Sequence, residues 1–176
     1  MTPNQKIWGI GLGRTGTKSL VAALTELGYT IQHIPAHLSD LMNSEIHGTA
    51  EGTTALHFRY LDLRFPGSKF ILTTRNLNEW LESCRRAIED LSPATRFEDD
   101  AMNEWADVMV RNRASRYGAI EYDRNTLIET YFRHHFDVVT HFKNRPQDLL
   151  IIDITSGQGW DELCAFLGCE IPNTPF

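Results

Sequence analysis

Short apolar runs alternate with amphipathic segments along most of this chain. Four of the runs predict buried parallel strands near residues 6–11, 29–34, 69–74 and 148–153. Between them, apolar residues recur every three or four positions, which is typical of helices that bury one face. Parallel strands need crossover connections, so the pattern predicts an α/β fold of three layers, with a central parallel sheet of four or five strands flanked by helices.

The amphipathic segments predict where the main helices lie. After a first helix that begins near residue 17, we expect helices over 55–64, 78–88, 98–116, 126–143 and 161–167, and a Gly/Thr-rich loop over 44–54. The apolar side chains of the two longest helices are expected in the core: Met102, Trp105, Ala106, Met109, Val110, Leu127, Tyr131, Phe132, Phe136, Val139 and Phe142. A basic run, Arg111, Arg113 and Arg116, is expected on a solvated face, with a second phosphate clamp as the alternative.

Composition indicates the class of protein, the kinds of partner to expect and the cellular location. The 176 residues are 41% hydrophobic and 23% charged, which predicts one globular domain over residues 1–176. The net charge of −6 argues against a nucleic-acid or membrane surface, so an anionic ligand needs a local positive site. Three cysteines without metal-ligand spacing and the lack of a long apolar run lead us to expect no metal, no membrane insertion and a cytoplasmic location, while the oligomeric state stays open.

The most informative stretch is the Gly-rich turn over residues 11–19, between the first strand and the first helix. Backbone N–H groups at a helix start have no partner within the helix, and the helix dipole adds positive charge there. Glycines let this backbone approach a ligand closely. Cations and hydroxyls are added by Arg14, Lys18, Thr15, Thr17 and Ser19. The stretch therefore predicts a site for a phosphate-like or sulfate-like anion.

Three kinds of anion-binding loop compete for this stretch. A kinase or nucleotidase loop, G-x-x-x-x-G-K-[ST], has the right glycine spacing, but Thr17 is inserted and moves Lys18 one position out of register. A Rossmann G-x-G-x-x-G motif matches literally, yet the second strand ends without the acidic residue that would hold a ribose. The phosphosulfate loop of sulfotransferases, [KR]-[ST]-G-T, fits residues 14–17 without a shift.

A second anion-binding element is expected where the strand near residues 69–74 ends. Arg75 follows that strand directly, and Ser83 lies eight residues later, two turns into the next predicted helix. Side chains in these two places can converge on one phosphate group. The spacing of an arginine after a strand and a serine eight residues on resembles the sulfotransferase site for the 3′-phosphate of 3′-phosphoadenosine 5′-phosphosulfate (PAPS).

Together, these segments resemble the P-loop sulfotransferase superfamily, most closely its short bacterial-type members. The likeness rests on G-x-G-R-T-G-T-x-S-L at 11–20, F-P-G-S-K-F-I-L-T-x-R at 65–75 and G-x-G-W-x-x-L-C-x-F-L-G at 157–168. The resemblance implies that PAPS binds and that 3′-phosphoadenosine 5′-phosphate (PAP) is released. It implies a 5′-phosphosulfate site made by Arg14, Thr15, Gly16, Thr17, Lys18 and Ser19, and a 3′-phosphate site made by Arg75 and Ser83.

The general base is expected shortly before the helix over 55–64. In related sulfotransferases a histidine or an acid stands about 20–25 residues ahead of the strand-end arginine, and Glu51 lies 24 residues before Arg75. A loop carboxylate beside two anion sites can take a proton from an acceptor hydroxyl. Many relatives have proline two positions after this residue, whereas Thr53 stands there, so His57 and His33 remain alternatives.

The resulting prediction is sulfuryl transfer from PAPS to a hydroxyl or amine of a small-molecule or carbohydrate acceptor. Arg14 and Glu51 are the expected catalytic residues. One alternative is an ATP- and magnesium-dependent small-molecule kinase that uses Lys18, Ser19 and Asp153, because Asp153 ends an apolar strand as a Walker B acid does. Another is a catalytically silent nucleotide-binding module.

Overall fold

The computed structural model describes residues 5–92 and 94–176. They divide into two compact units, one made of the chain up to Arg75 together with Val138–Phe176, and the other of Asn76–Asp137. The single domain that the length indicates stays a prediction.

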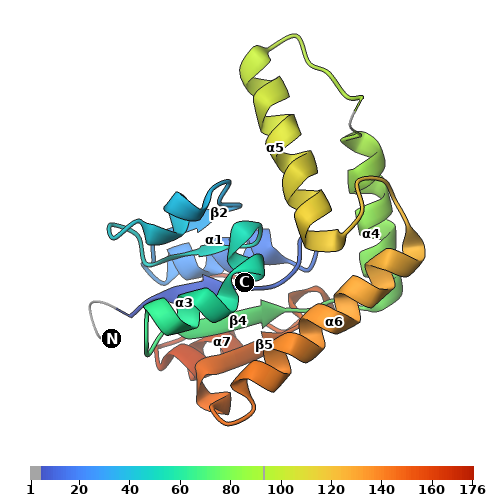
Figure 1. Cartoon of the computed structure of the whole chain (residues 1–176). Helices are drawn as coiled ribbons and strands as arrows, with labels where there is room; N and C mark the ends of the chain where they lie inside the picture. Colours follow the sequence, from blue (N-terminus) through green and yellow to red (C-terminus); the bar gives the residue numbers. More distant parts are fainter. Residues whose placement is uncertain (1–4, 93) are drawn as a thin grey trace. The chain divides into compact units, whose positions relative to one another are not determined.

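The first unit is built on a parallel sheet of five strands. Their order is β2-β3-β1-β4-β5, and every neighbouring pair is parallel. The strands are β1 Ile7–Gly9, β2 Ile31–His33, β3 Gly48–Ala50, β4 Lys69–Thr73 and β5 Leu149–Ile152, of which β4 and β5 lie side by side in Figure 1. All four strands expected from the sequence are present, so this part of the prediction is confirmed.

Strand β3 corrects our expectation of a loop over residues 44–54. Its three residues are small and buried, and they pair with both β1 and β2. A Cβ on Gly48 would lie 1.7 Å from the carbonyl oxygen of Ile7, so only glycine allows the two backbones to come this close. A Gly-Thr-Ala run has no large apolar side chains, and for that reason the hydrophobic pattern did not predict this strand.

Helices cover both faces of the sheet in the first unit. Successive strand residues point to opposite faces. Ile7 and Ile71 pack in a cluster with α1 Thr17–Glu26 and α7 Trp160–Leu167, whereas Trp8 and Phe70 pack in a second cluster with α3 Phe58–Arg64, the end of α6 Arg124–Phe142 and the short 3₁₀ helix η1 Leu38–Met42. The three-layer α/β fold with a central parallel sheet is therefore confirmed.

The remaining helices differ from the sequence prediction in detail. The helix expected over 55–64 is broken at His57 into α2 Thr53–Leu56 and α3. The other two long elements are α4 Leu77–Asp90 and α5 Asp100–Tyr117, and short 3₁₀ turns occupy Pro146–Asp148 and Ile154–Ser156. Within the described residues, no helix combines the length and the apolar character that crossing a bilayer requires.

The second unit contains α4, α5 and most of α6, held together by aromatic side chains. The ring of Trp80 on α4 lies 4.9 Å from Tyr131 on α6 and 6.1 Å from Tyr117 on α5, measured between ring centroids. The Thr130 hydroxyl donates to the carbonyl of Tyr117 at 3.0 Å. The three helices of this unit thus meet around Trp80.

Several side chains expected in the core are exposed instead. Phe132 and Phe136 on α6 are 57% and 69% exposed, and Met102, Trp105 and Val139 are exposed as well. Helix α6 carries apolar residues on two faces, and its buried positions include Leu127, Val138 and Phe142. Helical periodicity finds apolar faces but does not decide which of two faces packs against the protein, so this part of the prediction was wrong.

An ion pair at the buried Asp62 carboxylate ties α3 to the end of α6 and the residues that follow it in the first unit. Asp62, which is 9% exposed, accepts two hydrogen bonds from Arg145, at 2.9 and 2.6 Å, and one from His141 at 2.7 Å. The Arg145 guanidinium lowers the pKa of the Asp62 carboxyl below its usual value, and His141 adds to this shift against the opposing effect of burial. Because the folded pKa is depressed, this pair stabilises the protein above the ordinary carboxyl pKa and stops doing so as the pH falls through the folded value.

We expect Asp62→Asn to lower the free energy of unfolding at neutral pH by about 2–3 kcal/mol, since charged hydrogen bonds to a buried group are lost. Urea titrations of the wild type and the variant measure this difference. It should narrow below about pH 4, where the Asp62 carboxyl of the unfolded chain becomes protonated. Asp148→Asn is the matched control, because Asp148 lies 3.7 Å from the same arginine in a looser contact and should change stability little. An equal effect of the two substitutions, or a difference independent of pH, would contradict this account.

Candidate active site

The Gly-rich loop lies at the carboxyl edge of the sheet, between β1 and α1. Gly16 stands at the N-cap of α1 with φ at 94°, a conformation that favours glycine. Among the described residues no side chain caps this helix, and its first turn contains no acid. The start of α1 therefore keeps its partial positive charge for an anion.

A buried hydroxyl pair anchors the loop to the end of β4. The Thr15 hydroxyl donates to the carbonyl of Leu12 at 2.6 Å and lies 2.6 Å from the Thr73 hydroxyl. A Cβ on Gly11 would lie 1.9 Å from the same Thr73 oxygen, so the absence of a side chain at Gly11 makes room for this contact. The Thr15 side chain is thus engaged inside the protein, and its part in an anion site would come from the main chain. The pattern gave no sign of a role for Thr73.

The central feature of the site is a cluster of Thr17, His33 and Glu51. The Thr17 hydroxyl donates to Oε2 of Glu51, and the His33 Nε2 lies 3.2 Å from that oxygen and 3.2 Å from the Thr17 hydroxyl. These residues come from the start of α1 and from the ends of β2 and β3, which pair at one sheet edge. The Glu51 side chain is 13% exposed. The structure therefore brings the expected base, one of its two alternatives and the anion loop into direct contact.

Backbone strain concentrates at the same edge. Among the described residues, those other than glycine with positive φ are Arg14 at 74°, Ile34 at 53° and Glu51 at 66°. Arg14 directly follows the first two glycines of the loop, Ile34 follows β2, and Glu51 follows β3. A side chain in this conformation costs about 1–2 kcal/mol, and such strain tends to gather at functional sites. The main chain holds Glu51 in place, since its N–H donates to the carbonyl of Gly9 at 2.9 Å.

The cations of the site differ in their surroundings. Arg14, Lys18 and Ser19 are exposed at the loop and the first turn of α1. Arg75 follows β4, and its Nη1 donates to the carbonyl of Arg14 at 3.4 Å, which places its guanidinium against the loop. Ser83 lies in α4 of the second unit and is buried. Its convergence with Arg75 on one phosphate stays a prediction.

Two residues considered as alternatives, His57 as the base and Asp153 as a Walker B acid, have other surroundings in the structure. His57 joins α2 and α3, and no hydrogen bond links its side chain to the loop or to Glu51 among the described residues. The Asp153 carboxylate caps the turn after β5, where Oδ1 accepts from the Thr155 hydroxyl at 2.6 Å and from the Ser156 N–H at 3.1 Å. Asp153 therefore has a structural role in the fold.

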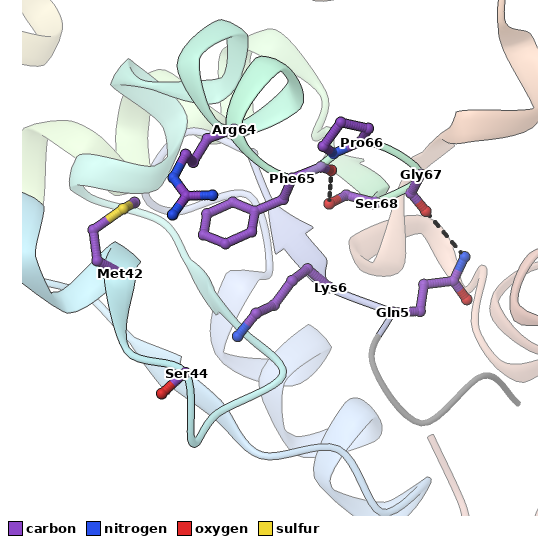
Figure 2. A pocket seen from close by; sticks show the side chains of 9 residues that line it. All are labelled: Gln5, Lys6, Met42, Ser44, Arg64, Phe65, Pro66, Gly67 and Ser68. Carbon is purple, nitrogen blue, oxygen red and sulfur yellow. Dashed lines mark hydrogen bonds between the residues drawn. The ribbon is translucent and has the colours of Figure 1, made fainter.

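A cavity of about 380 Å³ lies at the opposite edge of the sheet (Figure 2). Its walls come from the segments that precede β1 and β4, including Lys6, Arg64 and Phe65. The Lys6 ammonium donates to the Asn43 and Ile46 carbonyls, so it binds a neighbouring loop. The cavity is thus separate from the Thr17–Glu51 cluster. In the described part of the chain, no group of three metal-ligating side chains comes together.

A family model described as a sulfotransferase domain matches residues 6–57 and 36–176. These overlapping matches include the loop, Glu51, Arg75 and β5, and they confirm the resemblance to sulfotransferases. A search of curated proteins found no match.

The strain at Arg14 makes a testable prediction about stability. Arg14→Gly and Arg14→Ala both remove the guanidinium, but only glycine adopts a φ of 74° freely. Glycine relieves the strain but also raises the entropy of the unfolded chain, which offsets part of the gain. We therefore expect the glycine variant to be about 0.5–1 kcal/mol more stable than the alanine variant, as measured by urea denaturation.

The control is a comparison of glycine with alanine at an ordinary helical position, where we expect the alanine form to be the more stable of the two. Ala22 is exposed within α1, where glycine should cost about 1 kcal/mol relative to alanine. If the alanine variant at position 14 proved as stable as the glycine variant, the loop would not hold Arg14 in a strained conformation.

Proposed function

Because the chain belongs to the sulfotransferase domain family, we propose that it transfers a sulfuryl group from PAPS to a hydroxyl or amine of an acceptor, with Glu51 as the general base. Family membership indicates a transferase, whereas the donor, the class of acceptor and the residue roles are inferences. A cytoplasmic location and the closer likeness to short bacterial-type members also stay predictions.

The observation that carries the proposal is the hydrogen bond from Thr17 to Glu51. It joins Thr17, the first residue of α1, to the Glu51 carboxylate, which supports a base beside the sulfuryl group of a donor bound at this helix start. A general base must reach the proton that it removes, either directly or through one water molecule. A loop that only bound a nucleotide would gain nothing from a carboxylate at this point, because its negative charge opposes an anion.

The proposed reaction is an in-line displacement at sulfur. The acceptor oxygen or nitrogen attacks the sulfur, its bond to sulfur forms, and the sulfur–oxygen bond to the nucleotide phosphate breaks. Glu51 takes the acceptor's proton, and His33 holds the carboxylate in place through its contact with Oε2. Arg14 stabilises the negative charge that develops on the leaving oxygen. Catalysis then rests on positioning and electrostatics, as in phosphoryl transfer.

The phosphate groups of PAPS would be held by separate elements. We assign the 5′-phosphosulfate to the backbone of residues 15–19 with the side chains of Arg14, Lys18 and Ser19, and the 3′-phosphate to Arg75 and Ser83. The exposure of the first three side chains supports this, since an incoming anion can reach them. The Thr17 hydroxyl already donates to Glu51, so its contact with the sulfuryl group would accompany or replace that bond.

The kinase alternative is less well supported. It requires an acid that holds magnesium beside Lys18 and Ser19, and the carboxylate of Asp153 is used within its own turn. A magnesium requirement for turnover would nevertheless favour the kinase over the sulfotransferase, because the proposed reaction uses no metal.

Arg14→Ala should reduce the rate of PAP formation from PAPS about a hundredfold or more. Removing one preorganised donor to a developing charge typically costs about 2.7–4 kcal/mol of barrier. Turnover is measured as PAP release across a panel of phenolic, carbohydrate and amine acceptors. Lys143→Ala, which removes an exposed cation just after α6, is the control and should keep the wild-type rate. A turnover of Arg14→Ala within threefold of wild type would remove Arg14 from this role.

Glu51→Gln should lower kcat by about 10²–10⁴-fold while PAP binding is kept or becomes tighter, because the amide has the shape of the carboxylate without the charge that opposes an anion. His33→Asn is the comparison. If Glu51 is the base and His33 its positioning residue, the histidine variant retains more activity than Glu51→Gln. A larger loss of kcat in His33→Asn than in Glu51→Gln would instead identify His33 as the base.

A further inference from the structure

Arg113 occupies a buried position in the second unit. The buried residues of α5 are Ala106, Arg113 and Tyr117, whose spacings of seven and four residues place them on one face of the helix. Tyr117 packs edge-on against Trp80 of α4, so this face turns toward the interior of the unit. The position corrects our expectation of a solvated basic run, since Arg113 is only 8% exposed.

Two nitrogens of the Arg113 guanidinium have no hydrogen-bond acceptor among the described residues. Its Nε and Nη2, together with Nδ2 of the preceding Asn112, are buried and have no hydrogen-bond partner among the described residues. No carboxylate of the described residues forms an ion pair with this arginine. Buried polar groups in native proteins are nearly always hydrogen-bonded, and an unpaired buried charge costs several kcal/mol. The two unpartnered guanidinium nitrogens therefore indicate an acceptor that the described residues do not supply.

The neighbouring groups increase the positive character of this region. Arg116 lies over the Tyr117 ring, 5.3 Å from its centroid. Arg133 on α6 donates to the Thr130 hydroxyl at 3.1 Å, and that hydroxyl donates to the Tyr117 carbonyl. Burial also lowers the pKa of Arg113, and Tyr117 opposes this shift. The missing acceptor should therefore be negatively charged.

We propose that Arg113 binds an oxyanion of a ligand: a sulfate, phosphate or carboxylate group whose oxygens accept from Nε and Nη2. A guanidinium presents its donors in a planar fork that matches such a group. A nucleotide phosphate and an oxyanion from another ligand would be recognised by the same chemistry, and the experiment distinguishes these two sources. The inference does not depend on the proposed sulfuryl transfer, because inorganic sulfate is enough to test it.

The test compares the thermal midpoint of the full-length wild type with that of Arg113→Met, in sodium sulfate and in sodium chloride of equal ionic strength. Methionine fills a similar space without charge. We expect the sulfate-dependent rise in midpoint to be larger in the wild type by about 2–4 °C for each kcal/mol of binding free energy. Arg111→Gln, which removes an exposed arginine from the same helix, should behave as the wild type. Arg113→Gln serves as a second variant if the methionine variant does not fold.

Repeating the comparison with saturating PAP distinguishes the two sources. An excess sulfate response that persists with PAP assigns the oxyanion to a ligand other than the nucleotide. An excess that PAP abolishes, with weaker PAP binding by Arg113→Met, assigns it to a nucleotide phosphate. Equal sulfate responses of the wild type, Arg113→Met and Arg111→Gln in both conditions would overturn the proposal. Failure of PAP to bind at all would count against the proposed function but leave the sulfate comparison valid.

Discussion

The parallel arrangement of the sheet is the constraint on which the site depends. Because β1, β2, β3 and β4 all run in one direction, the residues that follow them meet at one edge. The loop after β1, His33 at the end of β2, Glu51 after β3 and Arg75 after β4 are separated in sequence but are brought to that edge. Glycine makes this possible at the points of closest approach, where Gly48 passes Ile7 and Gly11 passes Thr73.

The same edge carries backbone strain of a kind that tends to gather at functional sites. Arg14, Ile34 and Glu51 adopt a left-handed backbone that costs stability, although glycine in their place would avoid the strain. At two of these three positions the side chain is a charged group with a proposed catalytic role. The Thr17–Glu51 hydrogen bond and the His33 contact then fix the orientation of the strained carboxylate. This combination of strain and support is what a preorganised catalytic group requires.

The sequence was sufficient for the features that have a strong local signal. Four strands, the Gly-rich loop between β1 and α1 and the helices after β1 and β4 follow from apolar periodicity and turn residues. Strand β3 could not be found in this way, since a buried Gly-Thr-Ala run shows no alternation. The choice of Glu51 came from its distance to Arg75 in related proteins, whereas its contacts with Thr17 and His33 depend on strand order, which no local pattern gives. The burial of Arg113 was missed for a related reason, because a charged residue on a packed helix face contradicts the ordinary pattern.

The central claim is that the loop and Arg75 form a site for a 3′-phosphorylated nucleotide. The most direct measurement is calorimetric binding of PAP, beside ADP and ATP–magnesium, to the wild type, Arg75→Ala and Arg64→Ala. Arg64 is the control, since it lines the cavity at the opposite sheet edge. The account predicts that PAP binds more tightly than ADP or ATP–magnesium, and that only Arg75→Ala weakens PAP binding, by roughly tenfold or more. A preference for ATP–magnesium that does not depend on Arg75 would contradict it.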